Sequence, residues 1–434
     1  MLGAGASAQS FRSGYFLDNY VYGYHINPAQ VNEESFVGFV LTDIDLQHNA
    51  NFGMGTLLFP RNGKVVTGFN KAVTADEFLG GLSTPMTLSL DENINLLSFG
   101  IVKNKKTMHT FEVNLRTLGS VALPYDLFAF LKKGGNETYD LSGLDINVGV
   151  VGDIAYGYSR RINSQLSVGG RIHALIGVVN VNAYTDNSSI ALSPNETDLQ
   201  SEINLQTCGI LSLATDEDNK LDFGNTAMDG SPIGGYGAGL DLGVEYKPIE
   251  DLSITASVTD LGFISWKSTT SLKANANIRY TGGNIVYDDG DFETDFEDLL
   301  DDLTEAIEFK EAEAVSRMSL MPLNAALGVR YKMPFYKPLS VGVLGTYHVD
   351  SIAPWFDVRG GLTFTPSYLL SISGNVGYGT YGPTFGAALN AHLGPINLVL
   401  GADSFMGDMG KLNGIPVPLD NILLNLHLGL TASF

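Results

Sequence analysis

The sequence predicts an all-β fold, a transmembrane antiparallel β-barrel of about 14 strands with an N-terminal segment inside the lumen and long extracellular loops. Three observations predict it. Many segments alternate apolar and polar residues with a period of two. Glycine accounts for 50 of the 434 residues, and only 17% of residues are charged, against about 25% in soluble domains. The chain also ends on an aromatic residue, Phe434, at the close of an alternating strand.

Composition excludes several classes of protein. The net charge of −22 argues against nucleic acid as a partner, because a phosphate backbone calls for a basic surface. A single cysteine, Cys208, rules out an intrachain disulfide and a four-cysteine zinc site. Metalloprotease, redox, phosphate-loop and serine-hydrolase motifs are absent from the sequence. We therefore expect no enzyme activity, no cofactor and no metal.

The first residues resemble an export signal. Residues 1–8 end on Ala6-Ser7-Ala8, the small-x-small pattern that signal peptidase reads, and we interpret them as a signal-peptide remnant. Export of a chain without disulfides is typical of a bacterial envelope protein, and the predicted location is the outer membrane.

Residues 9–35 are rich in aromatic side chains and lack a long alternation. A 14-stranded barrel is too wide for its own side chains to fill. We predict that this segment plugs the lumen; the alternative is that it lies in the periplasm. The plug candidates are Tyr15, Phe16, Tyr20, Tyr24, Asn27 and Pro28.

Residues 36–434 form the predicted barrel, and the clearest strands are 144–158 and 424–434. Their polar faces carry mostly Gly, Ser, Thr and Asn, which favours a lumen over the solvated face of a soluble sandwich. Short connections rich in Lys and Arg, such as 103–106 and 333–338, are expected at the periplasmic end. Residues 267–317 are expected to form one long extracellular excursion, in which 271–280 extends the wall above the membrane.

Residues 288–313 hold 13 acidic residues and one lysine, with apolar residues at helical spacing. This pattern predicts an acidic amphipathic helix. The helix either packs on the barrel rim or docks a partner, and its spacing does not match a calcium-binding loop. The partner-docking candidates are Phe292, Phe296, Leu299, Leu303 and Ile307. A second, short helix is predicted at Tyr125–Lys133.

The polar faces of the strands carry charges of both signs. Opposite charges in a lumen pair into a network that can fix a plug, whereas a wide porin would line a water-filled lumen. The network candidates are Glu112, Arg116, Asp153, Arg171, Asp241, Glu245, Arg330, Asp357 and Arg359.

Three groups of motifs carry a resemblance that spans nearly the whole chain. They are Tyr15-Phe16-Leu17-Asp18 with Tyr24-His25-Ile26-Asn27-Pro28-Ala29, Leu123–Phe128 with Gly134-Gly135-Asn136, and Asp260–Trp266 with Met321-Pro322. The chain resembles a Bacteroidota outer-membrane barrel family of unassigned function, similar to the PorP and PorV types of the type IX secretion system and to fatty-acid-channel-like barrels. The resemblance implies a 14-stranded barrel with its N-terminus inside, and it brings no catalytic residues.

Two functions follow as hypotheses. The first is a non-catalytic structural or assembly subunit of an envelope complex. The alternative is a passive channel for small hydrophobic molecules. The expected partners are outer-membrane lipid, the barrel-assembly machinery that reads Phe434, and a periplasmic peptidoglycan-binding protein or larger envelope complex. A gap in the wall or an apolar pocket in the lumen would favour the channel, whereas a continuous wall around a filled polar lumen would favour the subunit.

Overall fold

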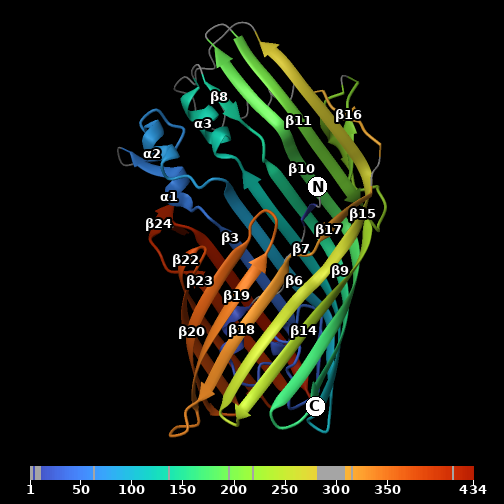
Figure 1. Cartoon of the computed structure of the whole chain (residues 1–434), viewed down its shortest axis with the longest axis vertical. Coiled ribbons are helices and arrows are strands. Elements are labelled where there is room, and N and C mark those ends of the chain that lie inside the picture. Colours follow the sequence, from blue (N-terminus) through green and yellow to red (C-terminus); the bar gives the residue numbers. More distant parts are fainter. Residues whose placement is uncertain are drawn as a thin grey trace.

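A computed structural model describes residues 3–4, 11–61, 64–134, 137–193, 196–217, 219–280, 308–313, 316–412 and 415–434. One antiparallel sheet curls into a closed barrel (Figure 1). Its wall has 14 strand positions, the first of which is shared by two short strands. They are β2 (Phe36–Phe39) with β3 (Asp43–Ala50), β6 (Met86–Lys103), β7 (Thr107–Leu123), β9 (Asp145–Arg161), β10 (Leu166–Ser193), β14 (Gly235–Ile249), β15 (Leu252–Tyr280), β18 (Leu323–Lys332), β19 (Leu339–Val349), β20 (Trp355–Ser367), β21 (Leu370–Gly379), β22 (Gly382–Leu393), β23 (Ile396–Phe405) and β26 (Ile422–Ser433).

The barrel closes between its first and last strands. Phe36 of β2 pairs with Ser433 of β26, and Leu46 of β3 pairs with Leu426. Every other neighbouring pair in the wall is antiparallel and consecutive along the barrel. The predicted fold class and the count of 14 strands are therefore confirmed.

Alternation along each strand places apolar side chains outside and polar side chains inside. On β26, Leu426, Leu428 and Leu430 are exposed, whereas Asn425 and His427 are buried. An exposed apolar face has no stabilising contact in water, but it matches the outward band that a bilayer requires.

An arginine on this outer face should be costly at mid-depth. Leu428 lies five residues from the end of β26, or about 13 Å along the membrane normal at the usual rise and tilt of such strands. We expect Leu428→Arg to lower the free energy of unfolding in lipid vesicles by about 2–4 kcal/mol. Ile396→Arg, next to a turn on the same outer face, should cost about 0–1 kcal/mol. Equal losses for the two variants in urea unfolding would contradict the assigned facing.

The two ends of the barrel differ in their connections. At the end that we call the turn end, successive strands are joined by short turns, such as the one between Lys103 and Thr107. The turn between β20 and β21 comprises only Tyr368 and Leu369. The longer connections lie at the opposite end, the loop end (Figure 1).

The wall is taller on one side (Figure 1). β14 begins at Gly235, and beyond it β11 (Glu196–Gly209) takes its place between β10 and β15. Residues 271–280 belong to the upper part of β15 and pair with β11. As expected from the sequence, this strand extends the wall above the barrel.

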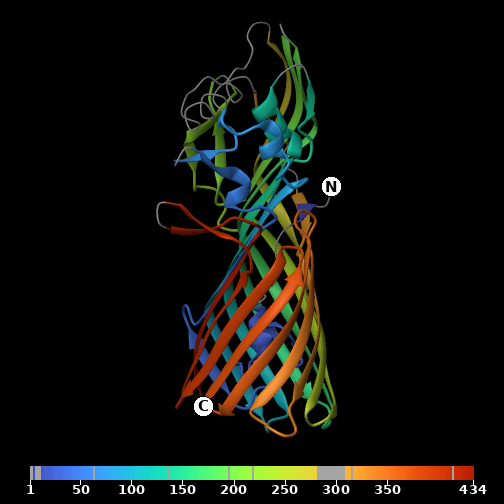
Figure 2. The same cartoon turned by 90° about the vertical axis from the view of Figure 1, so that its left-hand side faces the viewer.

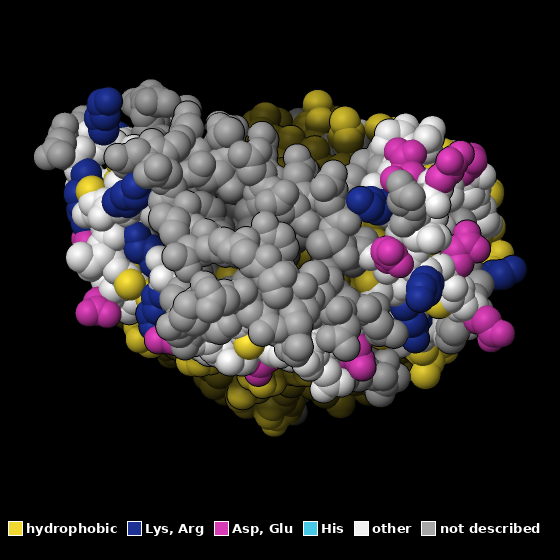
Figure 3. All heavy atoms as spheres, turned by 90° about the horizontal axis from the view of Figure 1, so that it is seen from above, with side chains coloured by type: hydrophobic (Ala, Val, Ile, Leu, Met, Phe, Trp, Pro, Cys, Tyr) yellow, Lys and Arg dark blue, Asp and Glu magenta, His cyan; other side chains and the backbone are white. Residues whose placement is uncertain are grey.

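Short elements form a cap at the loop end, around a cluster of buried apolar side chains that includes Phe78, Phe128 and Ile190. They are α1 (Met54–Leu57), β4 (Leu58–Arg61), β5 (Lys64–Thr67), α2 (Ala75–Leu79), α3 (Tyr125–Lys133) and β8 (Thr138–Asp140). The short helix predicted at Tyr125–Lys133 is α3. Within the described ranges, no helix has the length and apolar character to cross a membrane. Seen from this end, charged side chains of both signs lie around the margin of the molecule (Figure 3).

Further small strands complete the loop end. They are the hairpins β12 (Ser212–Thr215) with β13 (Leu221–Ala227) and β24 (Met409–Leu412) with β25 (Ile415–Pro418), and the short strands β16 (Lys310–Glu311), β17 (Ser316–Leu320) and β1 (Gly3–Ala4). β17 continues the wall beside β15, and β1 pairs with it in parallel.

Parts of the sequence-based predictions lie outside the described residues. All five partner-docking candidates, Phe292 to Ile307, are among them, as is most of the signal-peptide remnant at 1–8. Where the acidic segment is described, the predicted helix is wrong: Lys310–Glu311 is strand β16, paired with Leu272 and Lys273 of β15. These two residues pair with the edge of the tall strand β15 instead of forming the expected helical turn.

Candidate functional site

The N-terminal segment, residues 11–31, lies inside the barrel toward its turn end (Figure 2). Its only helical turns are two 3-10 turns, η1 (Arg12–Phe16) and η2 (Gly23–His25), and every residue of both is buried. Tyr20, Tyr22, Tyr24 and Phe11 form one apolar cluster with the wall. The segment therefore packs as the core of the barrel, as the sequence predicts.

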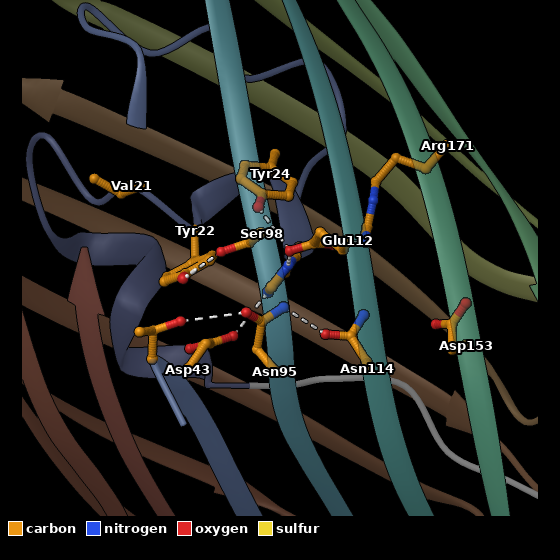
Figure 4. A network of polar contacts seen from close by, with 12 residues as sticks. Val21, Tyr22, Tyr24, Asp43, Asn95, Ser98, Glu112, Asn114, Asp153 and Arg171 are labelled. Atoms are coloured by element: carbon orange, nitrogen blue, oxygen red, sulfur yellow. Dashed lines mark hydrogen bonds and ion pairs between the residues drawn. The ribbon is translucent and has the colours of Figure 1, made fainter. Parts of the chain in front are cut away.

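Glu112 of β7 is the main link between this segment and the wall (Figure 4). Tyr24 Oη donates to Glu112 Oε1 at 2.7 Å, and His25 Nε2 lies 2.8 Å from the same oxygen. The Arg171 guanidinium pairs with the other oxygen, Oε2. A carboxylate that is fully buried is held in this way by two groups of the segment and one of the wall.

A chain of ion pairs runs on from Arg171 across the neighbouring strands. Arg171 Nη1 lies 3.2 Å from Asp241 Oδ2, and His173 bridges Asp241 and Asp153 at 3.0 Å each. Arg116 Nη1 lies 3.6 Å from Asp153 and 2.7 Å from Asp260. We call this set the charged layer: Glu112, Arg116, Asp153, Arg171, His173, Asp241 and Asp260. Because each charge has an opposite partner, the cost of burying it is offset.

A second group of charges holds the other side of the segment. Arg359 pairs with both Asp357 and Asp403, and it is fully buried. Ser13 of the segment bonds to Asp403 through its hydroxyl, and Asn375 Nδ2 donates to that hydroxyl at 2.7 Å. The segment is thus attached to strands on opposite sides of the lumen.

At the turn end, Asp18 anchors the segment to β18. Asp18 Oδ1 lies 2.9 Å from Arg330 Nη2 and 3.8 Å from Lys332 Nζ. Burial raises the pKa of the Asp18 carboxyl, but the two cations and the hydroxyl of Thr365 outweigh burial and leave that pKa below its ordinary value. A pocket of about 220 Å³ opens beside this contact and is lined by both the segment and Glu245. Glu245 bonds there to Ser253 and Lys247, apart from the charged layer.

Above the charged layer, toward the loop end, one side of the lumen carries apolar side chains. Three buried apolar side chains lie one inward-facing position nearer the loop end than a member of the charged layer on the same strand. They are Leu118 above Arg116, Val151 above Asp153 and Leu175 above His173. They form one cluster with side chains of the adjoining part of the wall, on and beside β11 and β15. This apolar layer comprises Leu118, Val151, Leu175, Cys208, Ile264, Trp266 and Met321.

The structure brings seven of the nine predicted network residues into contact with at least one other charged residue across the buried lumen, and it places Arg330 and Glu245 at the turn end. The predicted network did not include Arg12, His25, Asp43 or Asp260, all of which are buried in the lumen. Asp260 was missed because it lies at a bulge of β15 with a φ of 59°, where the alternation of faces breaks. Nothing in the sequence apart from their charge indicates that His25 and Asp43 face the lumen, since neither lies in a long alternating run.

A closed 14-stranded barrel with an apolar outer band and a buried N-terminal segment is an integral protein of the bacterial outer membrane. A family described as a family of unknown function, DUF5723, matches residues 28–403, and the chain belongs to that family. The turn end is accordingly periplasmic, and the loop end is extracellular. No curated protein matches the chain.

Solved structures share the architecture at low sequence identity. A mutant of the TodX monoaromatic hydrocarbon channel has a TM-score of 0.52 at 10% identity, with 96% of each chain covered. The Pseudomonas putida toluene transporter TodX gives 0.47 at 10% identity, covering 94% of this chain and 92% of that one. A Pseudomonas aeruginosa FadL homologue gives 0.44 at 11% identity, covering 100% and 99%. The TodX mutant with a TM-score of 0.52 shows that the chain shares the fold of a known outer-membrane barrel. The relation of the chain to the PorP and PorV types and to Bacteroidota stays a prediction.

Proposed function

We propose that this barrel is a gated passive channel for small hydrophobic compounds, closed in the present structure by the N-terminal segment. The observation that carries the proposal is the apolar layer, where Leu118, Val151 and Leu175 face a lumen that is otherwise polar. A water-filled pore would keep polar side chains at this depth. An apolar lining instead favours apolar solutes, whose transfer out of water is favourable. The TodX mutant named as a monoaromatic hydrocarbon channel, with a TM-score of 0.52, shares the fold, which agrees with this choice.

A bulge in the wall beside the N-terminal segment supports a gate. From Val37 to Asp43 the first strand has seven residues, where β26 has four from Ala432 to Gly429. Val40 and Leu41 have positive φ values of 32° and 62° and are exposed on the outer face, a backbone conformation that is costly for such side chains. Gly38, at the start of the bulge, lies so close to Tyr22 Oη that an added Cβ would come within 3.0 Å. Strain in the wall is therefore in contact with the segment that closes the lumen.

Uptake of N-phenyl-1-naphthylamine by intact cells tests the proposal, since this apolar dye fluoresces once it crosses the outer membrane. Cells carrying the protein should take up the dye several-fold faster than cells without it. Val151→Asp should remove most of that gain, because a charge in the apolar layer excludes the dye. Asn147→Asp, also inward on β9 but outside the layer, is the matched control. No gain in rate, or equal loss in both variants at equal amounts of folded barrel, would overturn the proposal.

The assembly-subunit hypothesis keeps one observation in its favour. The wall stays hydrogen-bonded even at the bulge, where Leu41 N donates to Asn95 O at 2.9 Å and Leu430 N to Thr42 O at 2.6 Å. Apart from the pocket of about 220 Å³ at the turn end, the cavities described between the segment and the wall are small, about 20 and 10 Å³. Mass spectrometry of the protein from native membranes in mild detergent tests this hypothesis. A stoichiometric envelope partner, together with no dye uptake, would make the barrel a subunit.

A further inference from the structure

Arg12 differs from the other buried arginines of the lumen. Its side chain is fully buried, with Cζ 4.7 Å above the ring centroid of Trp355. Arg116, Arg171 and Arg359 each bond to at least one carboxylate. In the part of the chain that the structure describes, none of the three guanidinium nitrogens of Arg12 has a hydrogen-bond partner. A buried guanidinium carries five N–H donors, and leaving all of them unpaired is unfavourable.

A small cavity adjoins this side chain, between the N-terminal segment and strands β15, β18, β19 and β20. Its volume is about 20 Å³, and Arg12, His25, Asn324, Thr346 and Trp355 are among its lining residues. A cavity of this size holds one water-sized species. It lies beside the contact between the segment and the wall, so whatever occupies it touches both.

The unpaired groups around the cavity are all donors. Among the described residues, Asn324 Nδ2 and Trp355 Nε1 also lack partners. The acceptor of Asn324 is occupied, because Oδ1 lies 2.8 Å from His348 Nδ1. The Thr346 hydroxyl already donates to the carbonyl oxygen of Asp357 at 3.3 Å. A water molecule accepts about two hydrogen bonds and needs acceptors for its own two protons, whereas a monatomic anion accepts from every side.

The carboxylates on this side of the lumen are already engaged. Asp357 and Asp403 both pair with Arg359, and Asp403 also accepts from Ser13. We propose that the cavity binds a monatomic anion of chloride size, held by Arg12, Asn324 and Trp355. The anion would accept hydrogen bonds both from the N-terminal segment and from β18 and β20, and so help to hold the segment in the lumen. This site is independent of the proposed transport of hydrophobic compounds.

Quenching of Trp355 by bromide tests the site directly. The chain has two tryptophans, so Trp266→Phe leaves Trp355 as the only tryptophan, and its emission is excited selectively over that of tyrosine. Bromide is titrated into this full-length variant in detergent, prepared without chloride, with gluconate holding the ionic strength constant. We expect saturable quenching that removes at least half of the emission. Chloride should displace the bromide, whereas acetate, which is too large, should not.

Two further variants identify the ligands, and a third serves as their control. Arg12→Met should abolish the saturable component and leave only weak linear quenching, whereas Arg330→Met, which removes another cation between segment and wall, should retain it. Asn324→Asp keeps the size of the side chain but adds a like charge, and it should weaken bromide binding at least tenfold. This variant decides the matter if Arg12→Met does not fold. Linear quenching in the parent protein, or equal displacement by acetate, would overturn the proposal.

Discussion

Glu112→Ala should lower the free energy of unfolding by about 3–5 kcal/mol, the usual loss when one partner of a buried ion pair is removed. The substitution leaves Tyr24 Oη, His25 Nε2 and one nitrogen of Arg171 without their acceptor. Arg171 keeps Asp241, so the loss falls mainly on the contact between the N-terminal segment and the wall. Urea unfolding of the detergent-solubilised or vesicle-bound barrel measures the effect.

Glu92→Ala is the matched control on the neighbouring strand. Glu92 pairs with His48 at 3.2 Å, but the two side chains are 33% and 47% exposed. Exposed pairs contribute about 0–1 kcal/mol, so this variant should unfold almost like the parent protein. Glu112→Gln, which keeps one oxygen acceptor, should fall between the two. A loss for Glu112→Ala as small as that for Glu92→Ala would show that the charged layer does not hold the segment.

Deleting residues 11–31 should convert a silent barrel into an open, ion-conducting one. The segment fills the lumen at the level of η1 and η2, and 14 strands enclose more space than wall side chains can occupy. Without the segment, buried wall charges such as Asp43, Glu112 and Arg359 would line a hydrated path. Single-channel recording in planar bilayers should show steady conductance for the deletion variant and none for the full chain.

The same recording shows whether the N-terminal segment closes the lumen or only occupies it. A deletion variant that inserts as a folded barrel yet stays silent would show that another part of the chain closes the lumen. The apolar layer would then be the next part of the chain to test, and Leu175→Ser in the deletion background would be expected to restore conductance. Heat-modifiable mobility on gels serves as the check that each variant is folded.

Most of the barrel could be predicted from the sequence because its wall obeys a local rule. On strands such as 144–158 and 424–434, alternation alone separates the bilayer from the lumen. The rule fails where the backbone departs from regular pairing. The first strand is split by the bulge at Val40 and Leu41, and residues before 92 alternate too briefly to assign.

The candidate site divides along the same line. Glu112, Arg116, Asp153 and Arg171 lie on regular strands, so their inward direction follows from parity. Arg12, which sequence reasoning did not single out, lies in a segment of 3-10 turns, where no periodicity indicates what a side chain meets. Its cavity depends on β18, β19 and β20, more than 300 residues further along the chain, and no local pattern encodes that proximity.

The seam between the first and last strands has a consequence for biogenesis. His427 of β26 stacks on Phe11 at 4.3 Å and lies 3.4 Å from Asp43 of β3, which in turn lies 3.5 Å from His25. The wall residues that contact the N-terminal segment are therefore not all in place until β26 has paired, although the segment is synthesised before the strands. The pairing of β3 with β26 joins residues nearly 400 positions apart and therefore forms late. The N-terminal segment accordingly stays without its full set of contacts through most of assembly. A chain truncated before β26 would leave the N-terminal segment exposed to periplasmic proteases, so burial of the segment depends on addition of the last barrel strand.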